Sequence, residues 1–298
     1  MSDRLRNLWT LGGLSLPELL RRTARESWDD DVFGQGGRMA FYHFLAIFPS
    51  LLLFVAVSTR VPQLGQHMQH ALSDLSGQVL PGQVSQMLQE MTSELHQRSR
   101  FGLGLISLAA AAIWAALNGT WAMIYGLNIA YEVQEHRNWR QMTATIVGMT
   151  LSLAVAGTVA VFLIFCSAYL QVHFHQGAFA LHGLEWLVVA ATLTFSFALL
   201  YRFAPCLTDY AWRWSTPGAL AALILWIAST VGARLYFNHV NNYATSYGHL
   251  NGVVMLLLWL YVTNGAILIG GEMNSEIEKA AAERVTKPSA PAAAHFRE

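Results

Sequence analysis

Two long apolar stretches near the C-terminus, residues 215–237 and 250–272, constrain the fold more than any other feature of this sequence. At about 1.5 Å per helical residue, a stretch of about 22 residues covers roughly 33 Å. That length is enough to cross the ~30 Å hydrocarbon core of a bilayer. Because a lone strand cannot satisfy its backbone groups in lipid, each stretch is expected to be a helix. The sequence therefore predicts that a membrane is the solvent of this region.

Four further apolar runs occur earlier in the chain, so the sequence predicts six transmembrane helices. The spans are expected at about 39–60, 101–130, 143–170, 184–203, 215–237 and 250–272. The composition agrees, because the chain is 54% hydrophobic and only 12% charged, about half the charged share of a soluble domain. We expect an all-α integral membrane bundle, with the membrane domain over residues 39–278.

Lys and Arg residues are unevenly distributed between the two ends of the expected spans. Six arginines lie in residues 1–38, and most of the others lie in the connectors after the second and fourth spans and in residues 279–298. The loops at the opposite ends carry only Arg60, Arg98 and Arg100. Loops rich in Lys and Arg stay in the cytoplasm, so both termini are predicted to be cytoplasmic.

Three segments lie outside the expected spans. Residues 1–38 are expected to contain an amphipathic helix from Leu16, which lies on the inner membrane surface or packs on the spans. The loop 61–100 has two apolar runs at helical spacing and predicts a periplasmic helical hairpin. Its apolar face either packs on the bundle or contacts a partner or lipid. The tail, residues 279–298, is rich in Ala and Pro and is expected to be disordered.

Arg234 and Glu272 stand out because a charged side chain inside a membrane is costly. In regular helices Arg234 lies roughly 28 Å along the fifth span, near the outer edge, and Glu272 roughly 33 Å along the sixth, near the inner edge. We therefore expect two separate sites instead of an ion pair. Arg234 either snorkels outward or faces polar residues of the outer side, namely Tyr243, Tyr247 and Asn251. Glu272 is expected to meet an arginine of the inner face, and the candidates are Arg38, Arg202 and Arg213.

Asn118 and Asn264 interrupt the second and sixth spans. Hydrogen bonding between helices explains such residues as well as ligand contact does. Small-residue spacings, such as Gly218/Ala222 and Ala266/Gly270, predict close helix contacts. The candidate ligand or gating residues are Arg234, Glu272, Arg38, Tyr247, Asn251, Asn118 and Asn264.

Signatures of catalysis are missing from the sequence. No GxSxG, HExxH, CxxC pair or P-loop occurs, and the formal net charge of +0 gives no sign of nucleic-acid binding. We expect no enzyme activity, no metal site and no cofactor, and we expect membrane lipids as partners. The spans do not specify an oligomeric state.

Several stretches in order resemble the YihY/BrkB family of bacterial inner-membrane proteins, over roughly Asp31 to Glu278. They are GGRMAFYHFLAIFPSLLLF, WAALNGTWAMIYGLNIAY, YRFAPCLTDYAWRWSTPGALAALILW, YATSYGHLNGVVMLLLWLY and ILIGGEMN. The resemblance implies six spans in the inner membrane, cytoplasmic termini and an association with serum resistance and envelope lipid handling. It also brings the label ribonuclease BN, which this sequence does not support, because water-activating metal ligands and a basic RNA-binding surface are missing.

The leading functional hypothesis is transport or translocation of a lipid or another amphiphile. Arg234 would then engage an anionic headgroup near the outer leaflet, and Glu272 and Arg38 would form an inner gate. The alternative is a non-transporting scaffold for envelope assembly, which binds a partner through the apolar face of the periplasmic hairpin. A membrane nuclease is the third and least favoured hypothesis.

Overall fold

The computed structural model describes residues 10–58, 104–173, 178–207, 217–239 and 249–286. Within these ranges the chain forms helices and no strand, so the prediction of an all-α fold is confirmed for this part of the chain. A short 3-10 helix, η1 (Leu11–Gly13), precedes seven α-helices. They are α2 (Leu16–Asp29), α3 (Val32–Ser58), α6 (Gly104–Ala130), α7 (Trp139–His173), α8 (Ala178–Phe203), α9 (Pro217–His239) and α11 (His249–Thr286).

Three helical segments among the described residues are long and apolar enough to cross a membrane. They are Ile106–Ala130, Trp139–Val159 and Gly252–Arg284. Leu187–Phe203 and Pro217–Ala233 are shorter apolar helices. The membrane class therefore follows from the structure, whereas the count of six spans stays a prediction. The predicted hairpin at 61–100 lies outside the described residues, as do Arg213 and Tyr247.

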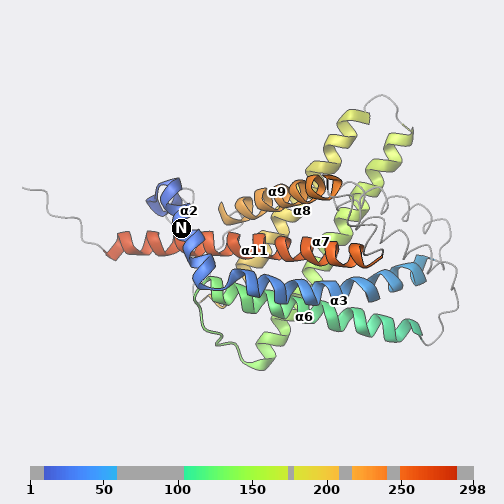
Figure 1. Cartoon of the computed structure of the whole chain (residues 1–298). Helices are drawn as coiled ribbons and strands as arrows, with labels where there is room; N and C mark the ends of the chain where they lie inside the picture. The colour runs from blue at the N-terminus through green and yellow to red at the C-terminus, as the bar shows by residue number, and fades with distance from the viewer. Residues whose placement is uncertain (1–9, 59–103, 174–177, 208–216, 240–248, 287–298) are drawn as a thin grey trace, which may run out of the picture.

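Helix α11 lies at the centre of the packing and contacts α9, α3, α6 and α2. Helices α3 and α6 run beside it, and α7 and α8 pair with each other toward one side of the molecule (Figure 1). The main core lies where α3, α6, α8, α9 and α11 meet. Its fully buried side chains include Met39, Ile124, Leu127, Leu200 and Leu268.

Small residues allow α9 and α11 to approach closely, as their spacing predicts. A Cβ atom added at Gly270 would collide with the Tyr201 hydroxyl, with the carbonyl oxygen of Gly218 and with Ala222. Asn274 accepts a hydrogen bond from the Gly218 N–H at 2.9 Å, which satisfies a donor in the first turn of α9. Backbone-to-backbone contact therefore fixes where these two helices cross.

The N-terminal elements cover the last turns of α11. Leu19 of α2 packs with Met273 and Ile277 of α11, and Arg284 donates a hydrogen bond to the Gly13 carbonyl. Residues 279–286, which the sequence placed in a disordered tail, are helical in the structure. The physical reason is burial: one face of these turns is covered by η1 and α2, so the helix is stabilised by packing.

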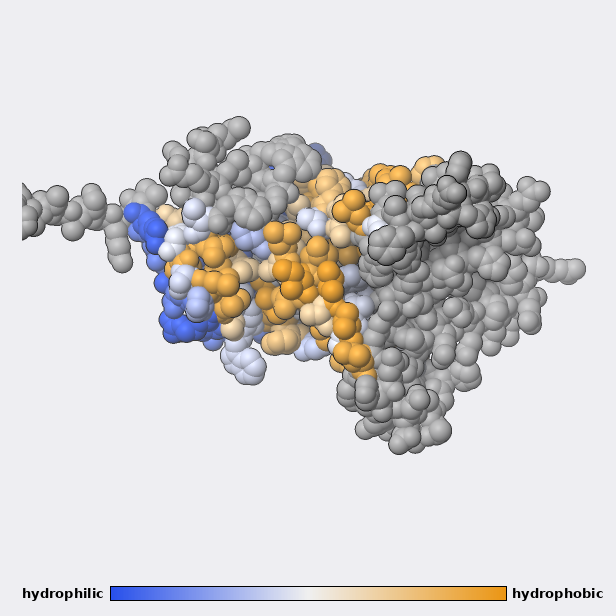
Figure 2. Space-filling model, turned by 90° about the horizontal axis from the view of Figure 1, so that it is seen from above, coloured by the Kyte–Doolittle hydropathy of each residue, from blue (hydrophilic) through white to orange (hydrophobic). Residues whose placement is uncertain are grey.

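The surface of the described bundle is apolar around its middle. Large side chains that are at least half exposed include Leu151, Val155 and Phe162 of α7 and Ile224 of α9. Figure 2 shows this apolar middle and the hydrophilic residues that gather at the end where α2 and the C-terminal part of α11 lie. An apolar belt beside a polar end is the surface expected of a helical bundle that sits in a bilayer.

Candidate functional site: an amphipathic groove between two helices

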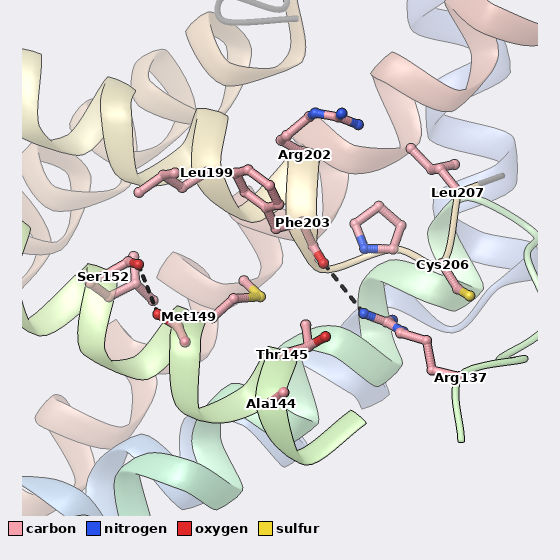
Figure 3. Close-up of a pocket in the computed structure, with 13 residues that line it drawn as sticks. Arg137, Ala144, Thr145, Met149, Ser152, Leu199, Arg202, Phe203, Cys206 and Leu207 are labelled. Carbon is pink, nitrogen blue, oxygen red and sulfur yellow. Dashed lines mark hydrogen bonds between the residues drawn. The ribbon is translucent and has the colours of Figure 1, made fainter. Parts of the chain in front are cut away.

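A cavity of about 360 Å³ opens between α7 and α8, near the connector that joins α6 to α7 (Figure 3). One end of the cavity is cationic, because Arg137 of the connector and Arg202 of α8 line it. The other lining residues are mostly apolar or small: Ala144, Thr145, Gly148, Met149, Ser152, Leu153, Leu199, Phe203, Pro205, Cys206 and Leu207. The cavity therefore combines positive charge with apolar walls.

A second cavity, of about 610 Å³, lies farther along the same two helices. It is lined by Leu151, Ser152, Val155, Ala156, Val159, Ala191, Thr192, Phe195 and Leu199. Ser152 and Leu199 line both cavities, so the two form one continuous depression, here named the α7–α8 groove. Its charge at one end and its apolar length match an amphiphile with an anionic head.

Arg137 is held in place at the cationic end by contacts on both sides. Its guanidinium donates to the Glu135 carboxylate at 2.7 and 2.8 Å. It also donates to the carbonyl oxygens of Phe203 and Ala204, at 3.4 and 2.8 Å. The end of α8 leaves these carbonyls without helical partners, and the arginine satisfies them. Arg137 therefore fastens the α6–α7 connector to the end of α8.

Glu135 and Asn128 complete this fastening. Asn128 donates to Glu135 at 2.8 Å and accepts from the Cys206 N–H at 2.8 Å. Burial by itself raises the pKa of Glu135, but the hydrogen bonds from Arg137 and Asn128 outweigh it and bring the pKa to about 2. Glu135 is thus a carboxylate at neutral pH, and most of the charge of Arg137 is neutralised.

Arg202 lies in the last turn of α8, where the helix dipole favours a cation. Its guanidinium carbon lies 5.6 Å from the centre of the Phe203 ring. The sequence indicated Arg202 only as a partner for Glu272, whereas the structure places it in the wall of the groove. Glu135 was not singled out, because its importance comes from Arg137 and Asn128, which contact Ala204 and Cys206 far along the chain.

The α2–α11 crossing

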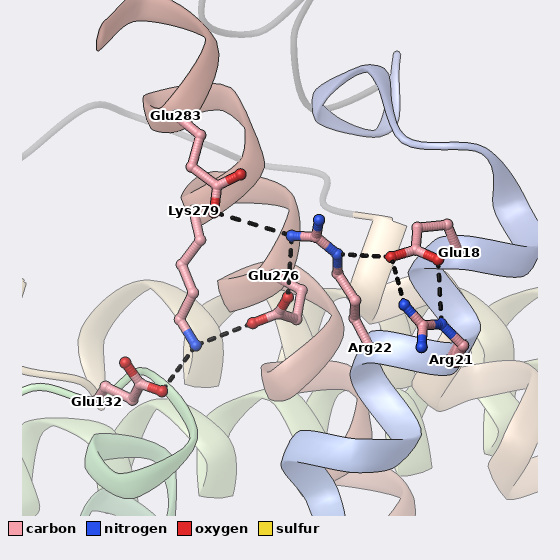
Figure 4. Close-up of polar contacts among 7 residues, drawn as sticks. All are labelled: Glu18, Arg21, Arg22, Glu132, Glu276, Lys279 and Glu283. Atoms are coloured by element: carbon pink, nitrogen blue, oxygen red, sulfur yellow. Dashed lines mark hydrogen bonds and ion pairs between the residues drawn. The ribbon is translucent and has the colours of Figure 1, made fainter. Parts of the chain in front are cut away.

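A second polar region lies where α2 crosses α11, at the hydrophilic end of the molecule. A cavity of about 450 Å³ is lined there almost entirely by charged residues of these two helices and by Glu132. Lys279 bridges Glu132 and Glu276 at 2.8 and 2.9 Å (Figure 4). The lysine thereby connects α11 to the α6–α7 connector.

Glu18 and Arg22 continue this network along α2. Glu18 accepts from Arg21 and Arg22 at 3.0–3.1 Å, and these hydrogen bonds lower the pKa of Glu18 to about 2. Arg22 lies 4.0 Å from Glu276 and 3.9 Å from Glu283. These pairs are partly exposed, so each stabilises the fold only weakly, and their role is to orient α2 on α11.

Glu272 is fully buried at the crossing. The ionisable groups that act on it most are Asp30, Lys279 and Glu26, and its carboxyl group lies within hydrogen-bonding reach of Asp30. Burial, followed by the Glu132 carboxylate, raises the pKa of Asp30, while the contact with Glu272 acts in the opposite direction. The sequence did not indicate Asp30, because nothing in its local pattern shows that α2 folds back over α11.

The other sequence-predicted residues are dispersed. Arg38 lies over the Tyr125 ring at 4.8 Å. Asn118 donates to the carbonyl of Trp114, one turn earlier, at 2.7 Å. Arg234 lies in α9 and Asn251 in α11, but their side chains lie outside the described part of the structure. The described candidates therefore do not gather at one place.

Asn264 has a partner that sequence reasoning missed. It is almost completely buried, donates to the Leu260 carbonyl at 2.8 Å and shares a hydrogen bond with the His43 side chain of α3. Nearby, the hydroxyls of Thr120 and Thr150 join α6 to α7 at 2.8 Å. An available signal for His43 was that it is the one histidine in the apolar run after Arg38.

Comparison with known proteins

Helices long enough to span a bilayer, an apolar belt and a charged end define an all-helical membrane protein. Residues 23–294 match the family described as Virulence factor BrkB. Because this match covers most of the chain, the protein belongs to the BrkB family, as the resemblance in its sequence predicted.

Three relatives are similar to the chain over most of its length. A Bacillus subtilis (strain 168) protein named as ribonuclease-like, YfkH, is 27% identical, over 82% of this chain and 90% of the relative. A UPF0761 membrane protein of Rhodospirillum centenum is 23% identical, over 96% of this chain and 64% of the relative. Another, of Pseudoalteromonas translucida, is 23% identical, over 83% of this chain and 81% of the relative. No solved structure matches the chain.

Proposed function

We propose that this protein binds a lipid or another amphiphile of the bacterial envelope and moves it across the inner membrane. The observation that carries the proposal is the α7–α8 groove, which joins two arginines to an apolar wall. A lipid with an anionic head fits this pattern, because its head meets the guanidinium of Arg202 and its chain lies along Val155, Val159 and Phe195. An opening toward the apolar belt lets such a molecule enter from the bilayer.

The orientation of this pathway rests on the distribution of charge in the sequence. The proposal places both termini in the cytoplasm, so the cationic end of the groove faces the inner leaflet. Arg234, with Tyr247 and Asn251, is proposed to contact the headgroup at the outer side. Arg38 and Glu272, near the inner side, are proposed to respond to its passage. The sequence contains no P-loop, so transport would be passive, coupled to an ion or driven by a partner.

A lipid-scrambling assay with the purified full-length protein in liposomes tests this function. The liposomes carry a fluorescent phosphatidylglycerol, and the rate at which the probe crosses the bilayer is measured. Arg202→Gln removes the charge that Arg202 brings to the groove and is expected to slow transport at least ~10-fold, the size of a lost charge-assisted contact. Arg140→Gln is the matched control, because Arg140 is an exposed arginine on the first turn of α7 that lies over Trp139 and outside the groove.

Two further measurements make the outcome decisive. Ser152→Phe fills the junction of the two cavities and is expected to slow transport of anionic and zwitterionic probes alike. Mass spectrometry of lipids that copurify with the protein identifies the bound class without a guessed substrate. Equal probe movement in liposomes with and without the protein would contradict translocation and leave the scaffold as the better explanation.

A further inference from the structure

The crossing of α2 and α11 contains buried oxygen atoms that lack the partners buried polar groups require. Both carboxylate oxygens of Glu272 and Oδ2 of Asp30 accept no hydrogen bond from an N–H or hydroxyl of the described residues. The hydroxyls of Thr23 and Ser27 are also buried without a partner in this part of the chain. Such groups normally find a partner, because an unsatisfied buried polar atom costs about 1–3 kcal/mol.

These oxygen atoms share one location in the fold. Thr23 and Ser27 lie on one face of α2, and Asp30 caps the end of this helix, three residues after Ser27. This is the face that Leu19 packs against α11. The carboxyl groups of Asp30, which follows α2, and of Glu272, in α11, lie within hydrogen-bonding reach of each other. Two carboxylates this close repel each other unless a positive charge lies between them.

The surrounding charges do not supply that positive charge in full. The carboxylates of Glu26, Asp29 and Glu132 add to the negative potential of the pair. Lys279 is the cation that acts on both carboxyl groups, but its ammonium group already bonds to Glu132 and Glu276. The crossing therefore has an excess of negative charge in a buried place.

We propose that the α2–α11 crossing binds a hard divalent cation, Mg²⁺ or Ca²⁺, between the carboxylates of Asp30 and Glu272. Two carboxylates neutralise a divalent ion, and oxygen ligands are the ones that these ions take. The hydroxyl of Ser27, one turn before Asp30, and water molecules complete the coordination. No third His, Cys, Asp or Glu of the described residues joins such a group, which suits Mg²⁺ in particular, because this ion keeps several of its waters.

Such an ion would join the N-terminal segment to the central helix of the membrane domain. Its binding would hold α2 on α11, beside the charged cavity at the cytoplasmic end. The proposal does not depend on lipid transport, because it is tested by binding and stability alone. It differs from the expectation from the sequence that the protein has no metal site.

Calorimetric titration and thermal unfolding of the full-length protein in lipid nanodiscs test the site. MgCl₂ and CaCl₂ are added separately, with NaCl at matched ionic strength as the control for screening. The wild type is expected to bind one ion and to gain about 100-fold in its folding equilibrium at 100 times the Kd. A gain of this size raises the Tm by several degrees in a chain of this length.

Substitutions distinguish cation binding at this site from binding at other acidic surfaces of the protein. Asp30→Asn and Glu272→Gln are expected to abolish the divalent-dependent rise in Tm. Asp29→Asn is the matched control, because Asp29 is the neighbouring exposed carboxylate, paired with Arg25 at 3.5 Å, and its removal should leave the rise unchanged. Ser27→Ala keeps both carboxyl groups and is expected to weaken binding several-fold, which retains a test if the first two variants do not fold.

The competing explanation for the close carboxyl groups is that Asp30 and Glu272 share a proton and bind no cation. In that case neither divalent salt binds the wild type or raises its Tm beyond the NaCl control, and Glu272→Gln is at least as stable as the wild type. That result overturns the proposal. Unchanged divalent affinity in every variant that folds also overturns it, because the ion would then bind elsewhere.

Discussion

Glu135 and Arg137 have the most extensive set of described contacts around the groove. Three acceptors, from Glu135, Phe203 and Ala204, surround the guanidinium of Arg137, whose side chain is 15% exposed. Asn128 adds contacts from α6 to the connector and to the chain after α8. The shape of the cationic end of the groove therefore depends on Glu135, Arg137 and Asn128, whose polar groups already bond to one another or to backbone atoms.

Replacing Glu135 with Gln is expected to make the fold less stable in a pH-dependent way. The pKa of this group is lowered to about 2 in the folded protein from an ordinary value of 4.5. Its contribution is therefore complete above pH ~4.5 and is lost as the pH falls toward 2. At pH 7 the variant should lose about 1–3 kcal/mol of unfolding free energy, as measured by chemical unfolding in detergent micelles.

The same comparison at pH 3 should give a smaller difference between wild type and variant. A double-mutant cycle with Arg137→Gln provides the control, and the two substitutions should be strongly non-additive. A loss of stability that is the same at pH 7 and pH 3 would show that the charge of Glu135 is not the cause.

Helices α9 and α11 approach each other closely. Gly218 and Gly270 allow the two backbones to approach closely, and the side chain of Asn274 in α11 accepts a hydrogen bond from the Gly218 N–H. Gly271 faces the opposite way, toward Leu127 of α6. Helix α11 thus has neighbours in close contact on two sides, which is consistent with its central place in the bundle.

Gly270→Val is expected to be among the most disruptive single substitutions in the chain. Its side chain would overlap the Gly218 carbonyl and Tyr201, so α9 must separate from α11, at a cost of about 3 kcal/mol or more. Thermal unfolding of the detergent-solubilised protein measures the loss. Gly232→Ala on α9 is the control, since open space surrounds Gly232, and its effect should stay within about 0.5 kcal/mol or stabilise slightly. Similar effects of the two variants would contradict close α9–α11 packing.

For the whole molecule, the apolar belt and the polar end define an axis across the membrane. The residues of the charged α2–α11 crossing and of the cationic end of the groove do not belong to the loops that the sequence predicts for the outer side. The distribution of Lys and Arg in the sequence predicts that this end of the molecule and both termini lie in the cytoplasm.

Reporter fusions test the orientation of the molecule. Green fluorescent protein at the C-terminus is expected to fluoresce, because it folds in the cytoplasm. Alkaline phosphatase inserted within residues 61–100 is expected to be active, because it requires the periplasm. Phosphatase inserted after Arg137 should be inactive and serves as the control; activity there would reverse the predicted topology.

The sequence by itself determined the class of protein, its helical content and the approximate positions of its long helices. These properties depend on local composition, because a run of about 20 apolar residues specifies its solvent without reference to the rest of the chain. It also identified Glu272 as an unusual residue, and its motifs predicted the family.

Only the tertiary structure decided which polar residues meet. Glu272 faces Asp30 because α2 folds back across α11, and Arg137 reaches Ala204 because α7 and α8 pair. Neither contact has a local sequence pattern, since both join residues that are far apart in the chain. The end of α11 was misplaced for the same reason: residues 279–286 have a tail-like composition but are helical because η1 and α2 cover them. Long-range packing, unlike apolar length, is a property of the folded molecule.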